Sequence, residues 1–368
     1  MKLLIHSNKA SHYRAPIYQL LDKTFKCDFC FGDDEGSNKI MDYSLLTGNV
    51  EEIHSVDWGV VEFQLGMVKQ LRKDYDTYVI YGATRCVSTW LFLITRKLFY
   101  PRKRVFGWSH GMLGKEGPIK RFLYRTMFGM MTGAFIYNER STNLMIACGI
   151  PGNKLHTIYN SLAYDQQLQI RNSLRATSLY KNHFGNDYNN IVFIGRLTTV
   201  KRFDLLLEAV AKLKARGEFV NVTFIGDGVE RNSMERRVDE LGISNQIWFY
   251  GACYDEQNNA ELIYNADLCV SPGNIGLTAM HVLMFGCPAI TNDDFNHQMP
   301  EFEAIQKGKS GAFFKVGDSS SLAETISYWF AEHKDDREAV RLACYHEIDS
   351  KWNTHNQIRI FKDVLQHD

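Results

Sequence analysis

The sequence has no net charge and no long uninterrupted apolar run. Its 42 basic residues balance 42 acidic ones over 368 positions, so the composition gives no overall attraction to nucleic acid. The longest apolar stretch, residues 87–99, contains Arg96 and Lys97 and cannot span a bilayer. Residues 1–7 lack the apolar length and the cleavage site of a signal peptide. We therefore expect a cytoplasmic protein, either free or attached to the inner face of the membrane, that binds no nucleic acid.

Paired cysteines are also scarce. Among eight cysteines only Cys27 and Cys30 form a C-x-x-C pair, and no second pair stands at metal-binding spacing. The pair lies in a strand-like alternation rather than at a helix start, which favours a buried strand over a redox or metal site. Unpaired cysteines used as small apolar residues fit a reducing compartment.

Short apolar strands alternate with amphipathic helices, a pattern typical of α/β architecture with parallel sheets. In the first half we predict strands at 2–6, 27–31, 77–81, 104–108, 134–137 and 155–159, and helices at 61–73 and 120–130. A polar connector is predicted at 165–190. In the second half, strands 191–194, 221–225, 247–250, 267–270 and 288–291 alternate with helices 203–216, 230–241, 256–264 and 278–285. We expect two doubly wound, Rossmann-like domains, 1–165 and 166–349, which face a cleft and bind ligands at the carboxyl ends of their strands.

Two basic residues follow the first strand of the second domain. Arg196 comes directly after Gly195 at the strand's end, and Lys201 precedes the next helix. A forked guanidinium and a point-charge ammonium at the mouth of such a sheet suit a diphosphate. The alternative is a solvated loop whose charges are incidental.

A glycine-containing loop follows a later strand and opens a helix, in the order Ser271-Pro272-Gly273-Asn274-Ile275-Gly276-Leu277-Thr278. Backbone N–H groups at a helix start, with the positive end of the helix dipole, can bind an anion. The alternative is a plain strand–turn–helix connection. Gly226-Asp227-Gly228 is no dinucleotide fingerprint, because the third glycine of that motif is replaced by Arg231; we interpret it as a turn beside the same cleft.

In the first half, one histidine stands at the predicted end of a strand. His110 follows Trp108-Ser109 and precedes Gly111, which would place its imidazole at the rim of the sheet. A purely structural histidine is the alternative.

From 191 to 314 the order of motifs resembles the donor domain of the retaining glycosyltransferases of family 4, which have the GT-B fold. The matching segments are 195–197 with Lys201, 224–228, 248–251, 266–267, 271–272, 276–277, 286–288, and 300–301 with Gly311. The first half matches more loosely, at 13–16, 110–111, Ser141 and 159–160. The resemblance implies sugar transfer from a nucleotide diphosphate with retained configuration, without metal or other cofactor. It also implies that a C-terminal helix, about 350–368, packs back on the first domain.

One departure from the family concerns two glutamates, eight positions apart, that contact the donor sugar and the ribose. Gly273 and His281 occupy these positions. Glycine offers no side-chain acceptor and histidine only a weak one. Glu301 matches a family position, and Glu303 is an extra carboxylate that we expect to substitute. The expected donor-binding set is Gly226, Asn274, Ile275, Gly276, Leu277, Thr278, His281, Glu301 and Glu303.

The expected function is transfer of a sugar from a UDP- or GDP-sugar to a glycan or lipid-linked saccharide, in synthesis of a cell-surface polysaccharide. Arg196 and Lys201 would stabilise the departing diphosphate, and His110 would touch the donor sugar or the reacting centre. One alternative is a catalytically degenerate module that binds nucleotide sugar or glycan. The other is a different GT-B enzyme, such as an epimerase that turns over its donor without acceptor.

The segment 96–125 combines basic and apolar residues. It contains nine basic residues against one acid, Glu116, interleaved with Leu98, Phe99, Tyr100, Phe122, Leu123 and Met127. Such a mixture favours docking on an anionic membrane surface. The alternative is a solvated basic face over ordinary core residues.

Overall fold

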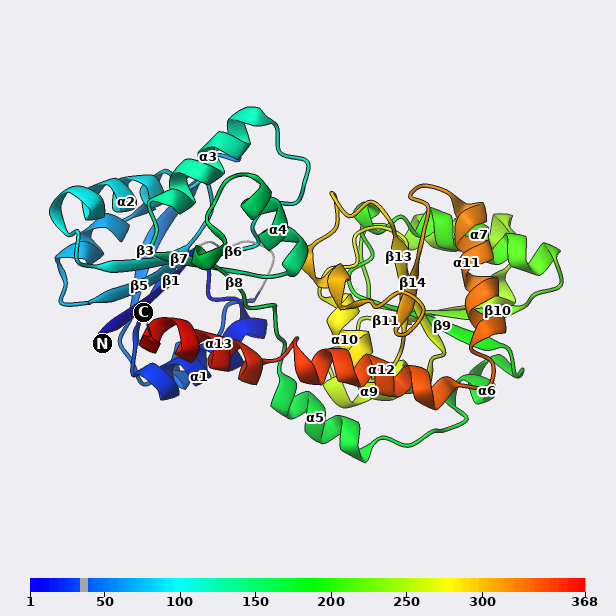
Figure 1. The fold of residues 1–368 in the computed structure, drawn as a ribbon. Helices are drawn as coiled ribbons and strands as arrows, with labels where there is room; N and C mark the ends of the chain where they lie inside the picture. Colours follow the sequence, from blue (N-terminus) through cyan, green and yellow to red (C-terminus); the bar gives the residue numbers. More distant parts are fainter. Residues whose placement is uncertain (34–38, 368) are drawn as a thin grey trace. The chain divides into compact units, whose positions relative to one another are not determined.

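The computed structural model describes residues 1–33 and 39–367, which form two compact units (Figure 1). Unit 1 comprises residues 1–163 and the C-terminal segment from Asn353, and unit 2 comprises Tyr164–Trp352. No helix in the described part of the chain is long and apolar enough to cross a bilayer.

Unit 1 is built on an eight-stranded sheet in the order β4-β3-β2-β1-β5-β6-β7-β8. All neighbouring strands are parallel except β3 and β4, which pair antiparallel. The strands are β1 Leu3–Ser7, β2 Asp28–Gly32, β3 Val50–Asp57, β4 Glu62–Leu65, β5 Thr77–Tyr81, β6 Arg104–Ser109, β7 Gly133–Ile136 and β8 Leu155–Thr157. The helices are α1 Ala15–Phe25, α2 Val87–Phe99, α3 Pro118–Gly129, α4 Glu139–Ala147 and α13 Thr354–His367.

Alternation along these strands supplies two apolar cores, one on each face of the sheet. Leu3, Ile5 and Phe29 belong to the core that α1 and α13 cover, whereas Leu4 and Cys30 belong to the core beneath α2 and α3 (Figure 1). The C-terminal helix therefore completes the fold of unit 1, through buried residues Ile358, Phe361, Val364 and Leu365.

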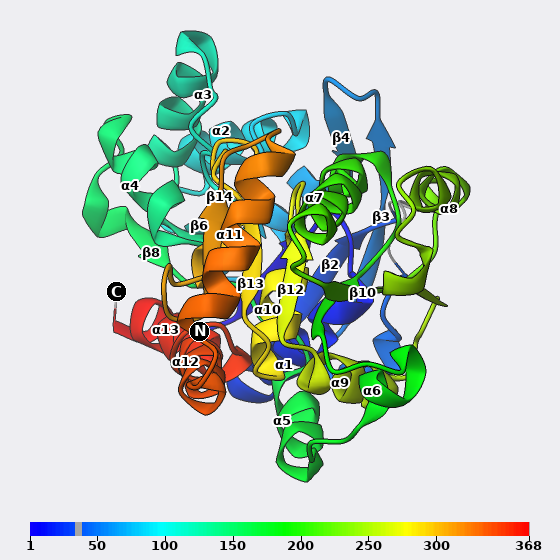
Figure 2. The same cartoon turned by 90° about the vertical axis from the view of Figure 1, so that its right-hand side faces the viewer.

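Unit 2 contains a six-stranded parallel sheet in the order β11-β10-β9-β12-β13-β14. The strands are β9 Asn189–Ile194, β10 Val220–Ile225, β11 Ile247–Gly251, β12 Leu268–Ser271, β13 Ala289–Asn292 and β14 Gly311–Phe314. α7 (Phe203–Ala215) packs on α11 (Ser319–Glu332), and α10 (Thr278–Met284) packs on α12 (Arg337–Ser350) (Figure 2). The remaining helices are α5 Tyr164–Ser173, α6 Leu179–Phe184, α8 Arg231–Glu240 and α9 Glu256–Asn265.

Two sequence predictions were wrong. The expected helix at 61–73 is instead strand β4 followed by a 3₁₀ helix, Met67–Arg72, with Gly66 at φ +104° between them. Glu62 and Gln64 point into the unit, where Glu62 pairs with Arg85 at 3.1 Å. The expected connector at 165–190 is largely helical, since it contains α5 and α6; it lies in unit 2, in agreement with the predicted second domain 166–349.

The C-x-x-C pair lies in and beside β2, as predicted. Both thiols are fully buried and unbonded, and burial raises the pKa of Cys30 to about 12. Burial also raises the pKa of Cys27 well above its ordinary value. Neither thiol has the low pKa or the access that redox chemistry requires.

Candidate functional site

The predicted donor-site residues lie on four loops at the carboxyl edge of the unit 2 sheet. Arg196 and Lys201 follow β9, Gly226 follows β10, and residues 274–278 connect β12 to α10. Glu301 and Glu303 lie on the 3₁₀ helix Pro300–Ala304 that follows β13. Because β9, β10, β12 and β13 are parallel, their carboxyl ends meet at one edge and bring these loops together.

Gly226 serves the packing of two loops rather than offering a side chain. A Cβ at this position would lie 1.9 Å from the carbonyl oxygen of Gly195, which follows β9. The Gly226 amide donates to the Gly251 carbonyl at 2.8 Å, and the Leu197 amide donates to that of Asp227 at 2.9 Å. The glycine therefore lets the β9 and β10 loops touch backbone to backbone.

Gly273 makes a second close approach of the same kind. Its Cβ would lie 1.9 Å from the carbonyl oxygen of Val200, and its amide donates to the Lys201 carbonyl at 2.9 Å. Its own carbonyl accepts hydrogen bonds at 3.0–3.1 Å from the side chains of Thr291, Asn292 and Gln298. The β12–α10 loop is thus fastened to the β9 loop on one side and to the end of β13 on the other.

The two cations of the site lie close together but are engaged differently. The half-buried ammonium of Lys201 donates to the Asn274 carbonyl, whereas Arg196 is exposed and has no partner in the described part of the chain. Burial and the positive charge of Arg196 lower the pKa of Lys201, against the opposing influence of the buried Glu301. An anion beside both cations would relieve this unfavourable potential, so the arrangement is suited to a phosphate group.

The amides at the start of α10 are only partly available. The Ile275 amide donates to the Gln298 side-chain oxygen at 3.0 Å, so it would have to leave this acceptor to bind phosphate as predicted. The amides of Gly276, Leu277 and Thr278 donate to no acceptor within the residues that the structure describes. The Thr278 hydroxyl donates to the Ile194 carbonyl at 3.0 Å, which anchors the helix to β9.

His281, in the first turn of α10, is paired with a carboxylate that sequence reasoning missed. Its Nε2 lies 3.0 Å from Oε1 of Glu256, the first residue of α9. Burial alone would raise the pKa of Glu256, but hydrogen bonds from His281 and Gln167 outweigh it and hold this pKa below its ordinary value. Glu303, the carboxylate expected from the sequence, is half-buried on the 3₁₀ helix Pro300–Ala304. Glu256 could have been found from the sequence, because it begins the helix that follows β11 and so lies at the ligand-binding edge.

In unit 1, His110 follows β6 beside the aromatic rings of Trp108 and Tyr137. Its ring centroid lies 4.8 Å from that of Tyr137, and the Arg14 guanidinium lies 4.1 Å from the Trp108 ring. The His110 side chain is exposed to solvent, although protein groups around it desolvate the imidazole in part. Desolvation and the charge of Arg14 lower the pKa of His110 to about 4. The imidazole is therefore neutral at neutral pH and can donate or accept a hydrogen bond.

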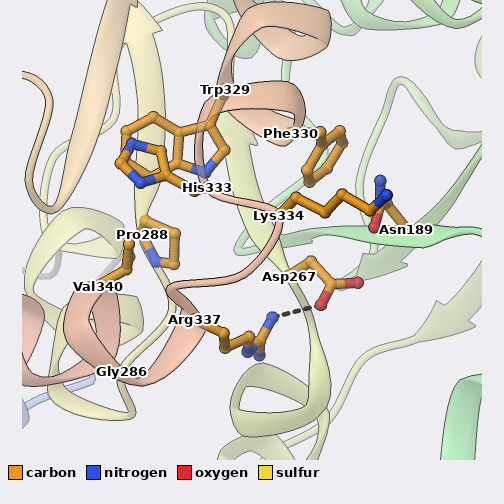
Figure 3. A pocket seen from close by; sticks show the side chains of 10 residues that line it. All are labelled: Asn189, Asp267, Gly286, Pro288, Trp329, Phe330, His333, Lys334, Arg337 and Val340. Carbon is orange, nitrogen blue, oxygen red and sulfur yellow. Dashed lines mark hydrogen bonds and ion pairs between the residues drawn. The ribbon is translucent and has the colours of Figure 1, made fainter.

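A separate cavity of about 240 Å³ opens at the opposite edge of the unit 2 sheet (Figure 3). It is lined at the amino ends of the strands by Asn189, Asp267 and Pro288, and by Trp329 and Arg337 from α11 and α12. The Arg337 guanidinium pairs with Asp267 and donates to the Ala266 carbonyl, so this cation is already engaged. None of the predicted site residues lines this cavity. Across the described residues, no cluster of three or more His, Cys, Asp or Glu side chains could hold a metal ion.

Comparison with known proteins finds a family resemblance in unit 2. Residues 176–343 match the family Glycosyl transferases group 1. Over 285 residues the chain is 25% identical to EpsD of Bacillus subtilis, whose name assigns it to the glycosyltransferases. The aligned part covers 74% of this chain and 72% of EpsD. A 41.2 kDa protein from the cps region of Klebsiella pneumoniae is 23% identical over 225 residues, which cover 59% of this chain and 57% of that protein.

Solved structures resemble both units. Alr3699/HepE of Anabaena, crystallised with UDP, aligns over the full length of both chains with a TM-score of 0.72 and 15% identity. The lipopolysaccharide outer core galactosyltransferase WaaB aligns equally completely, with a TM-score of 0.73 and 13% identity. At this identity the likeness shows the fold, and it confirms the prediction of a GT-B fold with two Rossmann-like sheets.

Proposed function

We propose that the protein transfers a sugar from a UDP- or GDP-sugar to a glycan or lipid-linked saccharide acceptor, with retention, in the synthesis of a cell-surface polysaccharide. The family match over residues 176–343 supports the transferase class. The names of EpsD and of the protein from the cps region support a role in polysaccharide synthesis. Retention rests on the resemblance of the sequence to glycosyltransferases of family 4.

One observation carries the proposal: an exposed arginine with no partner in the described chain, beside a lysine whose ammonium is disfavoured by burial. Arg196 and Lys201 lie at the carboxyl edge of the unit 2 sheet, where doubly wound proteins bind ligands. A nucleotide diphosphate would bring the negative charge that this pair lacks. Asn274, Gly276, Leu277 and Thr278 would contact the same diphosphate, with Glu301 next to Lys201.

The reaction breaks the bond between the anomeric carbon and the donor phosphate oxygen. Charge then grows on the departing diphosphate, and positive groups fixed beside it stabilise the transition state more than the ground state. Arg196 and Lys201 would supply this stabilisation. The acceptor oxygen would form the new bond on the face that the phosphate leaves, and its proton would pass to a phosphate oxygen. The role predicted for His110 at the reacting centre stays a prediction.

The test uses the variants Arg196→Ala and Arg196→Lys with purified full-length protein. We expect Arg196→Ala to lower turnover by about 100-fold or more, since each 1.4 kcal/mol of lost stabilisation is a factor of ten. Arg196→Lys should recover part of the loss, because it keeps the charge but loses the fork. The matched control is Arg236→Ala, which removes an exposed arginine from the middle of α8. Wild-type kinetics in Arg196→Ala would refute the site.

Product analysis separates the proposal from its alternatives. A panel of UDP- and GDP-sugars is screened by thermal shift, where a ligand at 100 times its Kd stabilises by about 2.7 kcal/mol. Donors that bind are then offered with and without saccharide acceptors. Acceptor-dependent product supports the transferase. Donor binding without any product would instead identify a binding module, and donor turnover without acceptor would identify an epimerase-type enzyme.

A further inference from the structure

Helix α2 of unit 1 carries apolar side chains both on the side that packs on the sheet and on the opposite, outer side. Its inner face contributes Phe92 and Leu93 to the core. Its outer face carries Leu91, Ile94 and Leu98 at helical spacing, and Leu98 is 67% exposed. The helix ends at Phe99, which is 72% exposed. A helix that covers a sheet normally presents polar side chains to water, so a second apolar stripe needs a partner outside the unit.

Helix α3 continues this surface. Ile119 and Phe122, one turn apart, are 79% and 66% exposed, whereas Met127 and Phe128 further along the helix lie in the core. Both helices cover the same face of the unit 1 sheet, as both ribbon views show (Figures 1 and 2). We refer to Leu91, Ile94, Leu98, Phe99, Ile119 and Phe122 with the basic residues around them as the α2/α3 face.

The charge on the α2/α3 face has one sign. Exposed basic residues lie on and beside the two helices, at Lys97, Arg102, Lys115, Lys120 and Arg125. The one acid between positions 96 and 125, Glu116, is 5% exposed and turns inward. Its carboxylate accepts the amides of Leu113 and Gly114 at 2.9 and 2.8 Å. The acid therefore stabilises the loop before α3 and does not neutralise the surface.

Three basic residues of the same segment serve the fold and not this surface. The Arg104 guanidinium donates to the carbonyls of Val364 and Leu365 at the end of α13, which is on the other face of the sheet. Arg96 donates to the Lys103 carbonyl at 2.6 Å, and Lys103 donates to the Lys73 carbonyl at 2.6 Å. Of the nine basic residues in the segment 96–125, these three therefore stabilise unit 1 and are not counted in the α2/α3 face.

We propose that the α2/α3 face docks on an anionic phospholipid bilayer. Bulky apolar side chains that protrude between exposed lysines and arginines match such a surface, since the apolar side chains enter the acyl boundary while the basic groups meet lipid phosphates. Exposure of the Phe99 and Phe122 rings to water is unfavourable, so these rings need an apolar environment. An acidic protein partner would account for the basic residues but does not require so many protruding apolar groups. The proposal is independent of the donor site, because every residue that carries it lies in unit 1.

Vesicle co-sedimentation tests the proposal. The full chain is mixed with vesicles of phosphatidylcholine alone, or of phosphatidylcholine with phosphatidylglycerol, at low and physiological salt. We expect the protein to pellet with the anionic vesicles and to pellet less at higher salt. The double variant Lys97→Gln/Lys120→Gln should lower the partition coefficient by about 30-fold, because each basic residue near an anionic surface contributes about a factor of five. Leu98→Ser/Phe122→Ser should lower it by about tenfold or more.

The control is Leu342→Ser, which removes an exposed leucine from α12 in unit 2 and should leave vesicle binding unchanged. Far-ultraviolet circular dichroism and UDP binding check that the unit 1 variants stay folded with an intact donor site. Failure of wild-type protein to pellet with anionic vesicles at either salt concentration overturns the proposal. Equal binding by the α2/α3 variants also overturns it. A dimer in analytical ultracentrifugation that Leu98→Ser/Phe122→Ser dissociates would assign the face to a second copy of the chain and overturn it as well.

Discussion

Gly273 is the position at which the structure makes the sharpest prediction, because no side chain fits there. Family 4 glycosyltransferases, which the sequence resembles, have a glutamate at the equivalent position. Here a Cβ would lie 1.9 Å from the Val200 carbonyl oxygen and 2.8 Å from the Lys201 Cα. Both are backbone atoms, so relief requires the β9 and β12 loops to move apart. The change Gly273→Ala therefore tests whether this backbone contact holds the site together.

The cost follows from two contributions. Overpacking a tight contact costs about 1–3 kcal/mol. Separating the loops also loses the hydrogen bond from the Gly273 amide to the Lys201 carbonyl, worth about 0.5–1.5 kcal/mol. The sum is about 1.5–4.5 kcal/mol, and each kcal/mol shifts the Tm of a domain of this size by about 2–4 °C. We expect a Tm about 3–18 °C lower for unit 2, and a loss of donor affinity as well because Lys201 moves with the loop.

Thermal unfolding by calorimetry and titration with donor nucleotide measure the two effects. The matched control is Gly117→Ala: Gly117 has φ −71° and no atom within 4 Å of a built Cβ, so alanine meets no clash there and should cost only about 1 kcal/mol or less as the N-cap of α3. We expect Gly273→Glu, which restores the family residue, to be worse than Gly273→Ala. If Gly273→Ala has the same Tm as the control variant, or if Gly273→Glu raises turnover, the contact with the Val200 loop does not shape this site and the reasoning is wrong.

Two further predictions concern the charged groups of the donor site. The pKa of Lys201 is lowered, and a bound diphosphate favours the charged form of this lysine, so donor affinity should fall as the pH rises through a pKa below the ordinary 10.5. Lys201→Arg should abolish this decline, and a variant with the same pH profile as the wild type would contradict the prediction. Because Glu256 bonds His281 at 3.0 Å, Glu256→Gln should weaken donor binding by about tenfold or more, as loss of a charged hydrogen bond implies, and more than Glu303→Gln. Titration calorimetry with the donor on both variants tests the second prediction. A larger loss of donor affinity in Glu303→Gln than in Glu256→Gln would show that Glu303 is the carboxylate that supports donor binding.

Most strands of both sheets could be predicted because buried parallel strands are short apolar runs between turn signals. The hairpin of β3 and β4 could not, since β4 turns Glu62 and Gln64 inward and their polarity conceals the strand. Their partners are distant in the chain: Glu62 pairs with Arg85, and the side-chain oxygen of Gln64 accepts from the Cys86 thiol at 4.0 Å. Burial of a polar pair depends on such tertiary contacts, which no local periodicity encodes.

In the donor site, the sequence could identify the loops but not the atoms that remain available. Arg196 and Lys201 were predicted from their place after a strand, and the structure brings them together. The engagement of the Ile275 amide by Gln298 joins positions 23 residues apart, and the Glu256–His281 pair joins positions 25 apart. Both depend on how neighbouring loops fold over the sheet edge, which motif spacing along one loop does not describe.

The hydrogen bonds that hold the β12–α10 loop in place affect how the candidate site would bind an anion. Thr291, Asn292 and Gln298 fix the Gly273 carbonyl, and the Lys201 ammonium holds that of Asn274, so the loop is ordered before any ligand arrives. Preorganised donors require little reorganisation when charge develops on a leaving group, which is the condition for strong electrostatic stabilisation. Arg196 is the exception, since its exposed side chain must lose rotamer freedom on binding, up to about 2 kcal/mol. In the proposed complex the rigid loop would set the position of the diphosphate, and the contact that Arg196 forms with it would determine how tightly the charged group is held.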